Sequence, residues 1–258
     1  MIFIQPSIDP IFFSLFFIDV RWYSLAYIIA FVFGSILIKK NNSISYNSIS
    51  NKQIDSFFLW AVIGVICGGR SGYVFFYQID LFFDNPIYLF EIWKGGMSFH
   101  GGLTGIILSS FLFSKKNNLN FLYLSDLIAL VAPIGLFFGR LSNFINSELY
   151  GRVTEFQLAV IYPSVDNNPR HPSQIYEALL EGFILFFILN TYFYRNPKKY
   201  KIGNLSAFFL IYYGFFRLLV EFLREPDSQI GLILNYFSMG QILSIPLIIF
   251  GLVIYFKK

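Results

Sequence analysis

Charged residues and cysteines are both scarce in this chain. Of its 258 residues, 13% are charged, 56% are hydrophobic, and Cys67 is the single cysteine. Soluble domains carry about a quarter charged residues, so a soluble fold of this length would lack polar surface to cover its core. One cysteine excludes an internal disulfide framework and a cysteine-rich metal site. The composition therefore predicts a polytopic membrane protein.

Seven apolar segments are long enough to cross the hydrocarbon core as helices, which takes about 20 residues each. The longest stretch between them, residues 142–172, contains Pro163, Pro169 and Pro172 and predicts a small ordered external subdomain. We expect an all-α fold: one transmembrane domain over residues 1–258, with this subdomain inserted between spans four and five. The spans are expected near residues 20–38, 57–77, 97–114, 121–141, 173–193, 204–223 and 237–256.

Lysines and arginines gather in alternate loops. One set of loops holds Lys39, Lys40, Lys115, Lys116 and Lys198 among others, whereas the other set is poorer in basic residues. Basic loops remain in the cytoplasm, so seven spans place the N-terminus outside and the C-terminus in the cytoplasm. This placement accounts for the net charge of +4 without a nucleic-acid partner.

Charged and polar residues inside the apolar spans are the most informative feature, because an arginine at a helix centre costs about 2.5–3.5 kcal/mol. They gather toward the external ends of the spans. A guanidinium matches phosphate oxygens in two contacts and stays charged in a dry site, so the arginines predict a phosphate site at headgroup depth. The candidates are Arg70, His100, Arg140, Asn143, Asn146, Glu148, His171, Gln174, Tyr176, Glu177, Arg217, Glu221, Arg224 and Glu225.

Helical spacing groups some of these candidates. Arg217, Glu221 and Arg224 stand at i, i+4 and i+7, which predicts one face of one helix. Arg140 and Asn143 stand at i and i+3, again on one face.

Each candidate also has a structural interpretation. Arg217 and Glu221 could form only a buried ion pair, Arg70 could anchor a helix at the interface, and the asparagines could cap a helix end. His100 could be an interhelical hydrogen-bond partner. Glu181 is expected to pair with an intramembrane donor. These interpretations leave unexplained why so many polar groups share one side of the membrane.

Six motifs, in this order and spacing, are similar to the prolipoprotein diacylglyceryl transferase family, whose bacterial members lipidate lipoprotein precursors. The fourth motif resembles the signature block of the family. The motifs are "RWYSLAY" (21–27), "GGRSGYVFFY" (68–77), "GGMSFHGGLTG" (95–105), "GRLSNFINSELYGRVT" (139–154), "RHPSQIYEALLEG" (170–182) and "YGFFRLLVEFLREPD" (213–227).

The resemblance implies a transferase of the bacterial inner membrane. Its lipid donor would be phosphatidylglycerol, its acceptor the lipobox cysteine thiol in the signal peptide of a prolipoprotein, and its leaving group glycerol 1-phosphate. Membrane lipids are its surroundings, and no metal or organic cofactor is implied. The important residues of the family fall on Tyr23, His100, Arg140, Asn143, Glu148, Gly151, Arg217, Glu221 and Arg224.

Ser142 departs from the family, which usually has glycine there. Because serine is small, we expect a turn at this position to survive.

The expected chemistry gives roles to several residues. A cysteine thiol has an ordinary pKa near 8.5 and must lose its proton to attack. Histidine side chains ordinarily titrate near pH 6.5, a value that suits a base, so His100 is a candidate base; it could instead orient the thiol. Arg140 and Arg217 would hold the phosphodiester and stabilise the departing phosphate, and Tyr23 would position a substrate.

Two other functions remain open from the residues alone. A transporter or channel for an anionic solute would place its ionisable groups near the midplane and show internal repeats. A phospholipid hydrolase would use water in place of the thiol.

Overall fold

The computed structural model describes residues 3–6, 8–15, 18–45, 48–226, 231–233 and 236–257. It divides into two compact units, residues 1–46 with 126–258 and residues 47–125. We call them the first and the second unit. Asp227, the last residue of the sixth motif, lies outside the described residues.

Helices make up most of the described chain. Six of them are long and apolar enough to cross a membrane: Trp22–Ile44, Asn51–Tyr77, Phe121–Ile145, Ser173–Arg195, Asn204–Glu221 and Met239–Phe256. The third predicted span is also helical, as α4 (Phe99–Lys116), but α4 is not among these six. Its His100 and its terminal lysines lower its hydropathy. The described residues therefore provide six candidate spans, as a polytopic helical membrane protein requires.

The second unit is a helical hairpin of α2 (Asn51–Tyr77) and α4, joined by α3 (Ile79–Asp84) and two short 3₁₀ turns, η1 (Pro86–Phe90) and η2 (Ile92–Lys94). Ser50 and Gln53 form a reciprocal cap at the start of α2. Glycines let the two helices approach closely: a Cβ on Gly68 would lie 2.3 Å from the carbonyl oxygen of Gly101.

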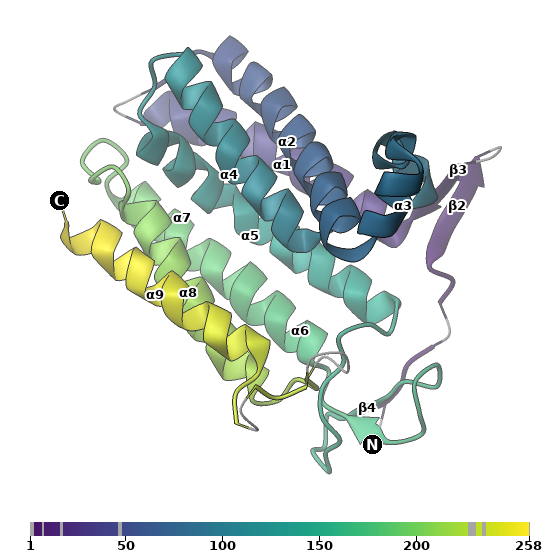
Figure 1. The fold of residues 1–258 in the computed structure, drawn as a ribbon. Coiled ribbons are helices and arrows are strands. Elements are labelled where there is room, and N and C mark those ends of the chain that lie inside the picture. Colours follow the sequence, from purple (N-terminus) through teal and green to yellow (C-terminus); the bar gives the residue numbers. More distant parts are fainter. Residues whose placement is uncertain are drawn as a thin grey trace. The chain divides into compact units, whose positions relative to one another are not determined.

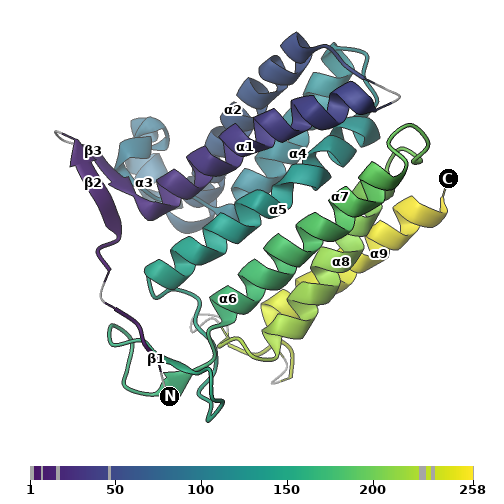
Figure 2. The ribbon, with the colours of Figure 1, turned by 180° about the vertical axis from the view of Figure 1, so that it is seen from behind.

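The first unit contains α1 (Trp22–Ile44), α5 (Phe121–Ile145) from Asp126 onward, α8 (Asn204–Glu221) and α9 (Met239–Phe256). Its remaining span is continuous from Ser173 to Arg195 and consists of α6 (Ser173–Glu177), the π-helical segment η3 (Ala178–Ile184) and α7 (Leu185–Arg195). Figures 1 and 2 show α7, α8 and α9 side by side.

Packing of α5 against α7 and α8 forms the core of the first unit. The buried residues of this core are Ala129, Leu130, Leu185, Leu189, Phe193 and Leu205. At one end, the buried carboxylate of Asp126 on α5 accepts hydrogen bonds from the amide and the hydroxyl of Ser206, both at 2.7 Å. An acceptor at a helix N-terminus satisfies amides that have no partner within the helix, so Asp126 fixes the start of α8 against α5.

Short strands were missing from the all-α prediction. A three-stranded sheet has the order β1 (Phe3–Ile4), β4 (Val160–Ile161), β5 (Pro169–Arg170). The pair β1–β4 is parallel and the pair β4–β5 is antiparallel. A separate antiparallel hairpin joins β2 (Ile11–Leu15) to β3 (Ile18–Arg21). The segment 142–172 thus contains β4 and β5, of which β4 pairs with β1 from the N-terminal segment.

Candidate active site

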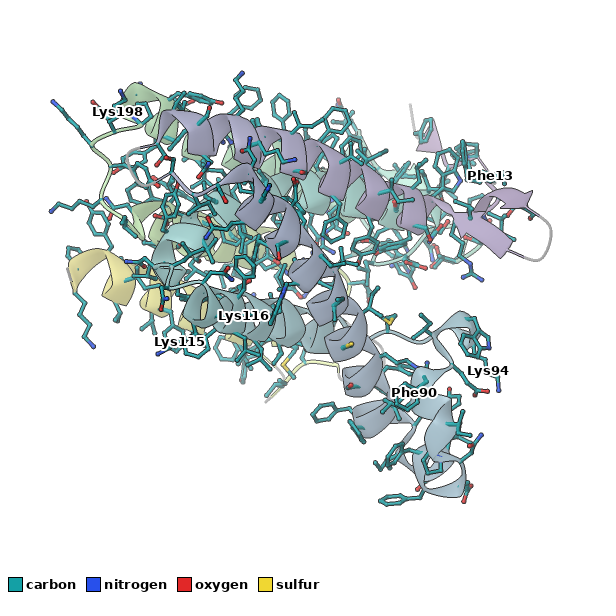
Figure 3. The ribbon with its side chains drawn as sticks, turned by 90° about the horizontal axis from the view of Figure 1, so that it is seen from above. Phe13, Phe90, Lys94, Lys115, Lys116 and Lys198 are labelled. Atoms are coloured by element: carbon teal, nitrogen blue, oxygen red, sulfur yellow. The ribbon has the colours of Figure 1, made fainter. Side chains whose placement is uncertain are left out.

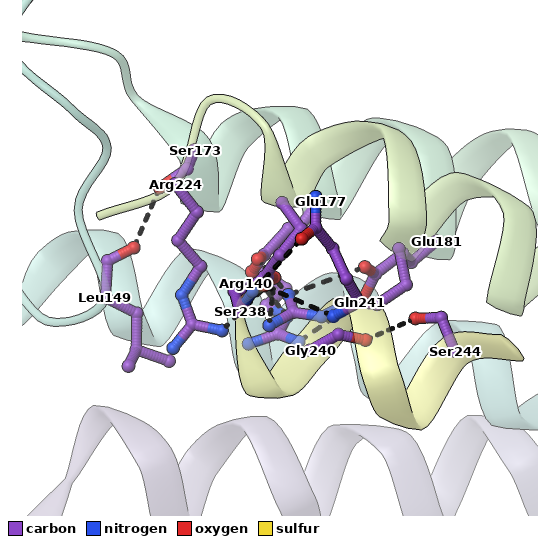
Figure 4. Close-up of polar contacts among 12 residues, drawn as sticks. Arg140, Leu149, Ser173, Glu177, Glu181, Arg224, Ser238, Gly240, Gln241 and Ser244 are labelled. Atoms are coloured by element: carbon purple, nitrogen blue, oxygen red, sulfur yellow. Dashed lines mark hydrogen bonds and ion pairs between the residues drawn. The ribbon is translucent and has the colours of Figure 1, made fainter. Parts of the chain in front are cut away.

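Arg140 and Arg217, from two different helices, meet on the same carboxylates. Arg140 lies on α5, and its Nε is 2.9 Å from Oε2 of Glu177; Figure 4 shows these two side chains beside Glu181. Arg217 lies on α8, and its Nη1 donates to the other oxygen of Glu177. Glu181 joins both arginines, at 3.3 Å from Nη2 of Arg140 and 3.7 Å from Nη1 of Arg217. The convergence that the sequence predicted for the two guanidinium groups is therefore present.

Glu221 and Arg224 extend this cluster. Arg217 Nη2 lies 2.9 Å from Oε2 of Glu221, and Arg224 Nη1 lies 3.8 Å from the same oxygen. The helix α8 ends at Glu221, so Arg224 is not on a continuous helical face as its spacing predicted. Arg224 is instead held by an antiparallel bridge with Gly151. We call Arg140, Glu177, Glu181, Arg217, Glu221 and Arg224 the arginine cluster.

The arginine cluster is largely buried, its most exposed side chain being Arg140 at 16%, and its formal charges balance. Glu177 and Glu181 are 0% exposed, Glu221 is 4% exposed and Arg217 is 8% exposed. Three guanidinium groups face three carboxylates, so no net formal charge is buried when all six are ionised. Removing one partner from such a set would leave an uncompensated charge, which costs about 3–5 kcal/mol.

A second polar group lies at the end of α5, within the signature block. Asn143 is buried; its Nδ2 donates to the hydroxyl of Tyr23 and to Oε2 of Glu148, the latter at 3.1 Å. Asn146 Nδ2 lies 3.4 Å from Oε1 of Glu148. The predicted residues Tyr23, Asn143, Asn146 and Glu148 thus form one connected set, with hydroxyl, amide and carboxylate groups that can bind the hydroxyls of a polar headgroup.

Gly151 stands where two chain segments leave no room for a side chain. Its amide donates to the carbonyl of His171 at 2.9 Å, and a Cβ there would lie 2.4 Å from that oxygen and 2.7 Å from the Leu223 carbonyl. Gln174 donates to the Glu148 carbonyl at 2.6 Å. These contacts tie the signature block to the start of α6 and to the segment that follows α8.

The polar segment beside Gly151 carries its own ion pairs. Arg170 Nη2 lies 2.6 Å from Oδ2 of Asp166, and its Nη1 lies 3.3 Å from Oε2 of Glu225. The Arg170 hydrogen bond lowers the pKa of the Asp166 carboxyl from its ordinary 3.8 to about 2. Burial lowers the pKa of the His171 imidazole, whose Nδ1 lies 3.3 Å from the hydroxyl of Tyr176.

The prolipoprotein diacylglyceryl transferase family model matches residues 10–257 of this chain. The chain belongs to the prolipoprotein diacylglyceryl transferase family. Three curated relatives carry the name phosphatidylglycerol–prolipoprotein diacylglyceryl transferase. The protein from Rickettsia bellii (strain OSU 85-389) is 48% identical over 98% of this chain and 96% of its own. The protein from Vibrio vulnificus (strain CMCP6) is 49% identical over 96% of this chain and 90% of its own. The protein from Vibrio parahaemolyticus is 47% identical over 96% of this chain and 89% of its own.

The family resemblance also included two motifs in the second unit. Arg70 is buried there and donates to the backbone carbonyls of Tyr88, Leu89 and Gly95, so it holds together the segment that precedes α4. His100 is exposed in the first turn of α4. Arg70 therefore has a structural role, close to the anchoring interpretation.

Ser142, the departure from the family pattern, lies within α5 and not in a turn, so that expectation was wrong. Its hydroxyl donates to the Phe138 carbonyl at 3.0 Å and lies 3.4 Å from the Trp22 carbonyl. Serine commonly bonds the carbonyl four residues earlier in a helix, which explains how the position accepts it.

The sequence analysis noted Glu177 and Glu181 but did not include them among the predicted catalytic or lipid-binding residues. The signal was available: two carboxylates four residues apart inside an apolar span. Glu181 was expected to pair with an intramembrane donor, and the structure confirms this pairing. Gly240 on α9 was missed entirely; a Cβ there would lie 2.5 Å from the Glu221 carboxylate.

Proposed function

We propose that this protein transfers the diacylglyceryl group of phosphatidylglycerol to the lipobox cysteine of prolipoproteins. The observation that carries the proposal is near full-length similarity to relatives named for this reaction, at 47–49% identity. In the reaction, the cysteine sulfur attacks the diacylglyceryl carbon that bears the phosphate ester. The carbon–oxygen bond breaks, its electron pair stays on the phosphate oxygen, and glycerol 1-phosphate leaves.

In this proposal, the arginine cluster binds the phosphodiester. Arg140 and Arg217 come from different helices, and shared carboxylates hold their guanidinium groups in position before the lipid binds. Donors fixed in advance stabilise the charge that develops on the leaving phosphate without reorganisation. Glu221 and Arg224 complete the phosphate site by orienting and supplementing Arg217.

The set around Asn143 is proposed to bind the polar headgroup. Tyr23, Asn143, Asn146 and Glu148 offer hydroxyl, amide and carboxylate groups for glycerol hydroxyls. Gly151 keeps this set in place through its close packing. His100 is proposed to take the proton of the thiol, or to orient the thiol.

The proposed topology has seven spans, with α4 as the third. Residues 142–172 lie outside the membrane, the N-terminus is external and the C-terminus cytoplasmic, in the bacterial inner membrane. The prolipoprotein signal peptide and the lipid both reach the site laterally from the bilayer.

A reconstituted assay tests the function. Purified protein in phosphatidylglycerol vesicles is mixed with a lipobox peptide, and the thioether product is measured by mass spectrometry. Removing one pre-positioned hydrogen-bond donor from a site that stabilises developing negative charge lowers kcat by about 10²–10³-fold. We expect a fall in the transfer rate of about that size for Arg140→Ala and for Arg217→Ala. Arg21→Gln removes an exposed arginine outside the site and serves as the control. Full activity of the Arg140→Ala/Arg217→Ala double variant would end the phosphate-site assignment.

The same assay separates the remaining alternatives. A near-normal rate for His100→Asn would remove His100 as an obligatory base, whereas a changed pH–rate profile would support it. Release of diacylglycerol without peptide would indicate a hydrolase. Anion flux through the vesicles without lipid transfer would indicate a transporter.

A further inference from the structure

An open cavity with a basic lining lies at the end of the first unit where α7 gives way to a loop. Its volume is about 560 Å³. Ser43 and Ile44 at the end of α1 form one wall, and the segment from Tyr194 to Lys199 forms the other. Figure 3 shows Lys198 at the opposite end of this unit from Phe13.

Three cations line this cavity, namely Arg195, Lys198 and Lys199. Its other lining residues are polar or apolar, and none of them is acidic. In this respect the cavity differs from the arginine cluster, where each guanidinium lies beside a carboxylate. A cavity with this lining favours an anionic ligand.

An apolar groove adjoins the cavity. It has a volume of about 440 Å³ and is lined by Leu37 on α1 and by Phe186, Phe187, Asn190 and Thr191 on the continuous span that ends in α7. Tyr194 and Arg195 line both spaces, so the groove leads directly from the cations along the helices. From Phe186 to Arg195 the helix rises about 13 Å, which matches a large part of one acyl chain.

The walls of the two spaces are fixed. The Tyr194 hydroxyl donates to Oδ1 of Asn41 at 2.6 Å, which joins α7 to α1 beside the cavity. Asn190 donates to the carbonyls of Leu130 and Phe186, at 3.1 and 2.9 Å. The groove therefore exists before a ligand binds, which reduces the ordering cost of binding.

This place is separate from the proposed phosphate site. Glu181 and Arg195 lie on one continuous span and are fourteen residues apart, a rise of about 21 Å. The general preference for basic cytoplasmic loops explains why lysines occur at this end. It does not explain why they surround a cavity that continues into an apolar groove.

We propose that the cavity and groove together bind one anionic phospholipid, with its phosphate among Arg195, Lys198 and Lys199 and an acyl chain along Phe186, Phe187 and Leu37. The lipid is a structural ligand and not the lipid consumed in the reaction. It bridges α1 and α7 and stabilises their contact. The inference does not depend on the proposed function, since it concerns binding at the other end of the span.

Native mass spectrometry of the whole protein tests the proposal. The protein is released from vesicles that contain phosphatidylserine and phosphatidylcholine, and retained lipids are counted. Each Lys or Arg near an anionic lipid surface contributes about 1 kcal/mol, which is about fivefold in affinity. The Arg195→Gln/Lys198→Gln/Lys199→Gln variant should therefore bind phosphatidylserine roughly a hundredfold more weakly than the wild type. This variant should lose one retained phosphatidylserine. The control Lys52→Gln/Lys201→Gln/Lys257→Gln removes the same charge outside the cavity and should retain it.

A second variant tests the groove. Thr191→Trp fills the apolar space and leaves all three cations in place, so it should also lose the retained phosphatidylserine. Inorganic phosphate should raise the thermal midpoint of the wild type much less than phosphatidylserine does. Three results would each overturn the proposal. They are retention of phosphatidylcholine by the wild type as strong as that of phosphatidylserine, loss of phosphatidylserine in the lysine control as large as in the triple variant, and full retention of phosphatidylserine by Thr191→Trp. Lipid transfer by the triple variant is measured alongside, so failure of the proposed function is seen separately.

Discussion

Glu177 is the carboxylate that contacts both Arg140 and Arg217 most closely, and Glu177→Gln tests its part in the arginine cluster directly. In the wild type, one carboxylate oxygen lies 2.9 Å from Arg140 Nε and the other accepts from Arg217 Nη1. Glutamine keeps the size of the side chain but removes its charge. Its amide nitrogen must also face one of the two guanidinium groups, donor against donor.

The size of the stability loss in Glu177→Gln follows from the burial of Glu177 and from its charge. Glu177 is 0% exposed, and its loss changes the formal charge of the arginine cluster from zero to +1. Breaking a buried pair by removing one partner costs about 3–5 kcal/mol. At about 2–4 °C per kcal/mol for a chain of this size, the thermal midpoint should fall by roughly 6–20 °C.

The assay is thermal unfolding of the purified protein in detergent, with and without added phosphatidylglycerol. A bound phosphodiester would supply the missing negative charge, so added lipid should narrow the deficit of Glu177→Gln relative to the wild type. A merely structural carboxylate would give the same deficit with and without lipid. Glu155→Gln removes an exposed carboxylate and should shift the midpoint very little. A midpoint for Glu177→Gln within about 1 °C of the wild type would refute the reasoning.

Three further predictions concern other parts of the molecule. Gly68→Ala places a Cβ 2.3 Å from the Gly101 carbonyl oxygen and should lower the free energy of unfolding by about 1–3 kcal/mol, measured by thermal unfolding. In the control Gly102→Ala, the new Cβ lies 3.7 Å from Val65, so its stability should be nearly unchanged. Equal effects of the two substitutions would contradict close packing of α2 on α4. Asp166 has a depressed pKa of about 2 in place of 3.8, so its contribution to stability is complete above about pH 5 and is lost as the pH falls through 3.8 toward 2. The difference in midpoint between wild type and Asp166→Asn should therefore stay constant from about pH 7 to pH 5 and shrink below that, and a difference that changes between pH 7 and pH 5 would be inconsistent with this. Cys67→Ser should transfer lipid at the wild-type rate in the vesicle assay, because the attacking thiol belongs to the substrate; a large loss would assign Cys67 a role in the reaction.

The sequence by itself determined the helices and which charged residues stand inside them. Long apolar runs must satisfy their backbone groups internally, so each predicted span is helical within a few residues. The arginines and carboxylates could be recognised because charge is costly inside such a run. The spacing of Arg217 and Glu221 also predicted a pair on one helix, which is present at 2.9 Å.

Only the tertiary structure decided which groups meet. Arg140 and Glu177 are far apart in the chain, so nothing local indicates that one carboxylate serves Arg140 and Arg217 together. The same holds for β1, which pairs with β4 from the opposite half of the chain, and for Arg224, which is placed by its bridge to Gly151 beyond the end of α8. The physical reason is that helix formation depends on neighbouring residues, whereas ion pairs and strand pairing depend on how separate segments pack.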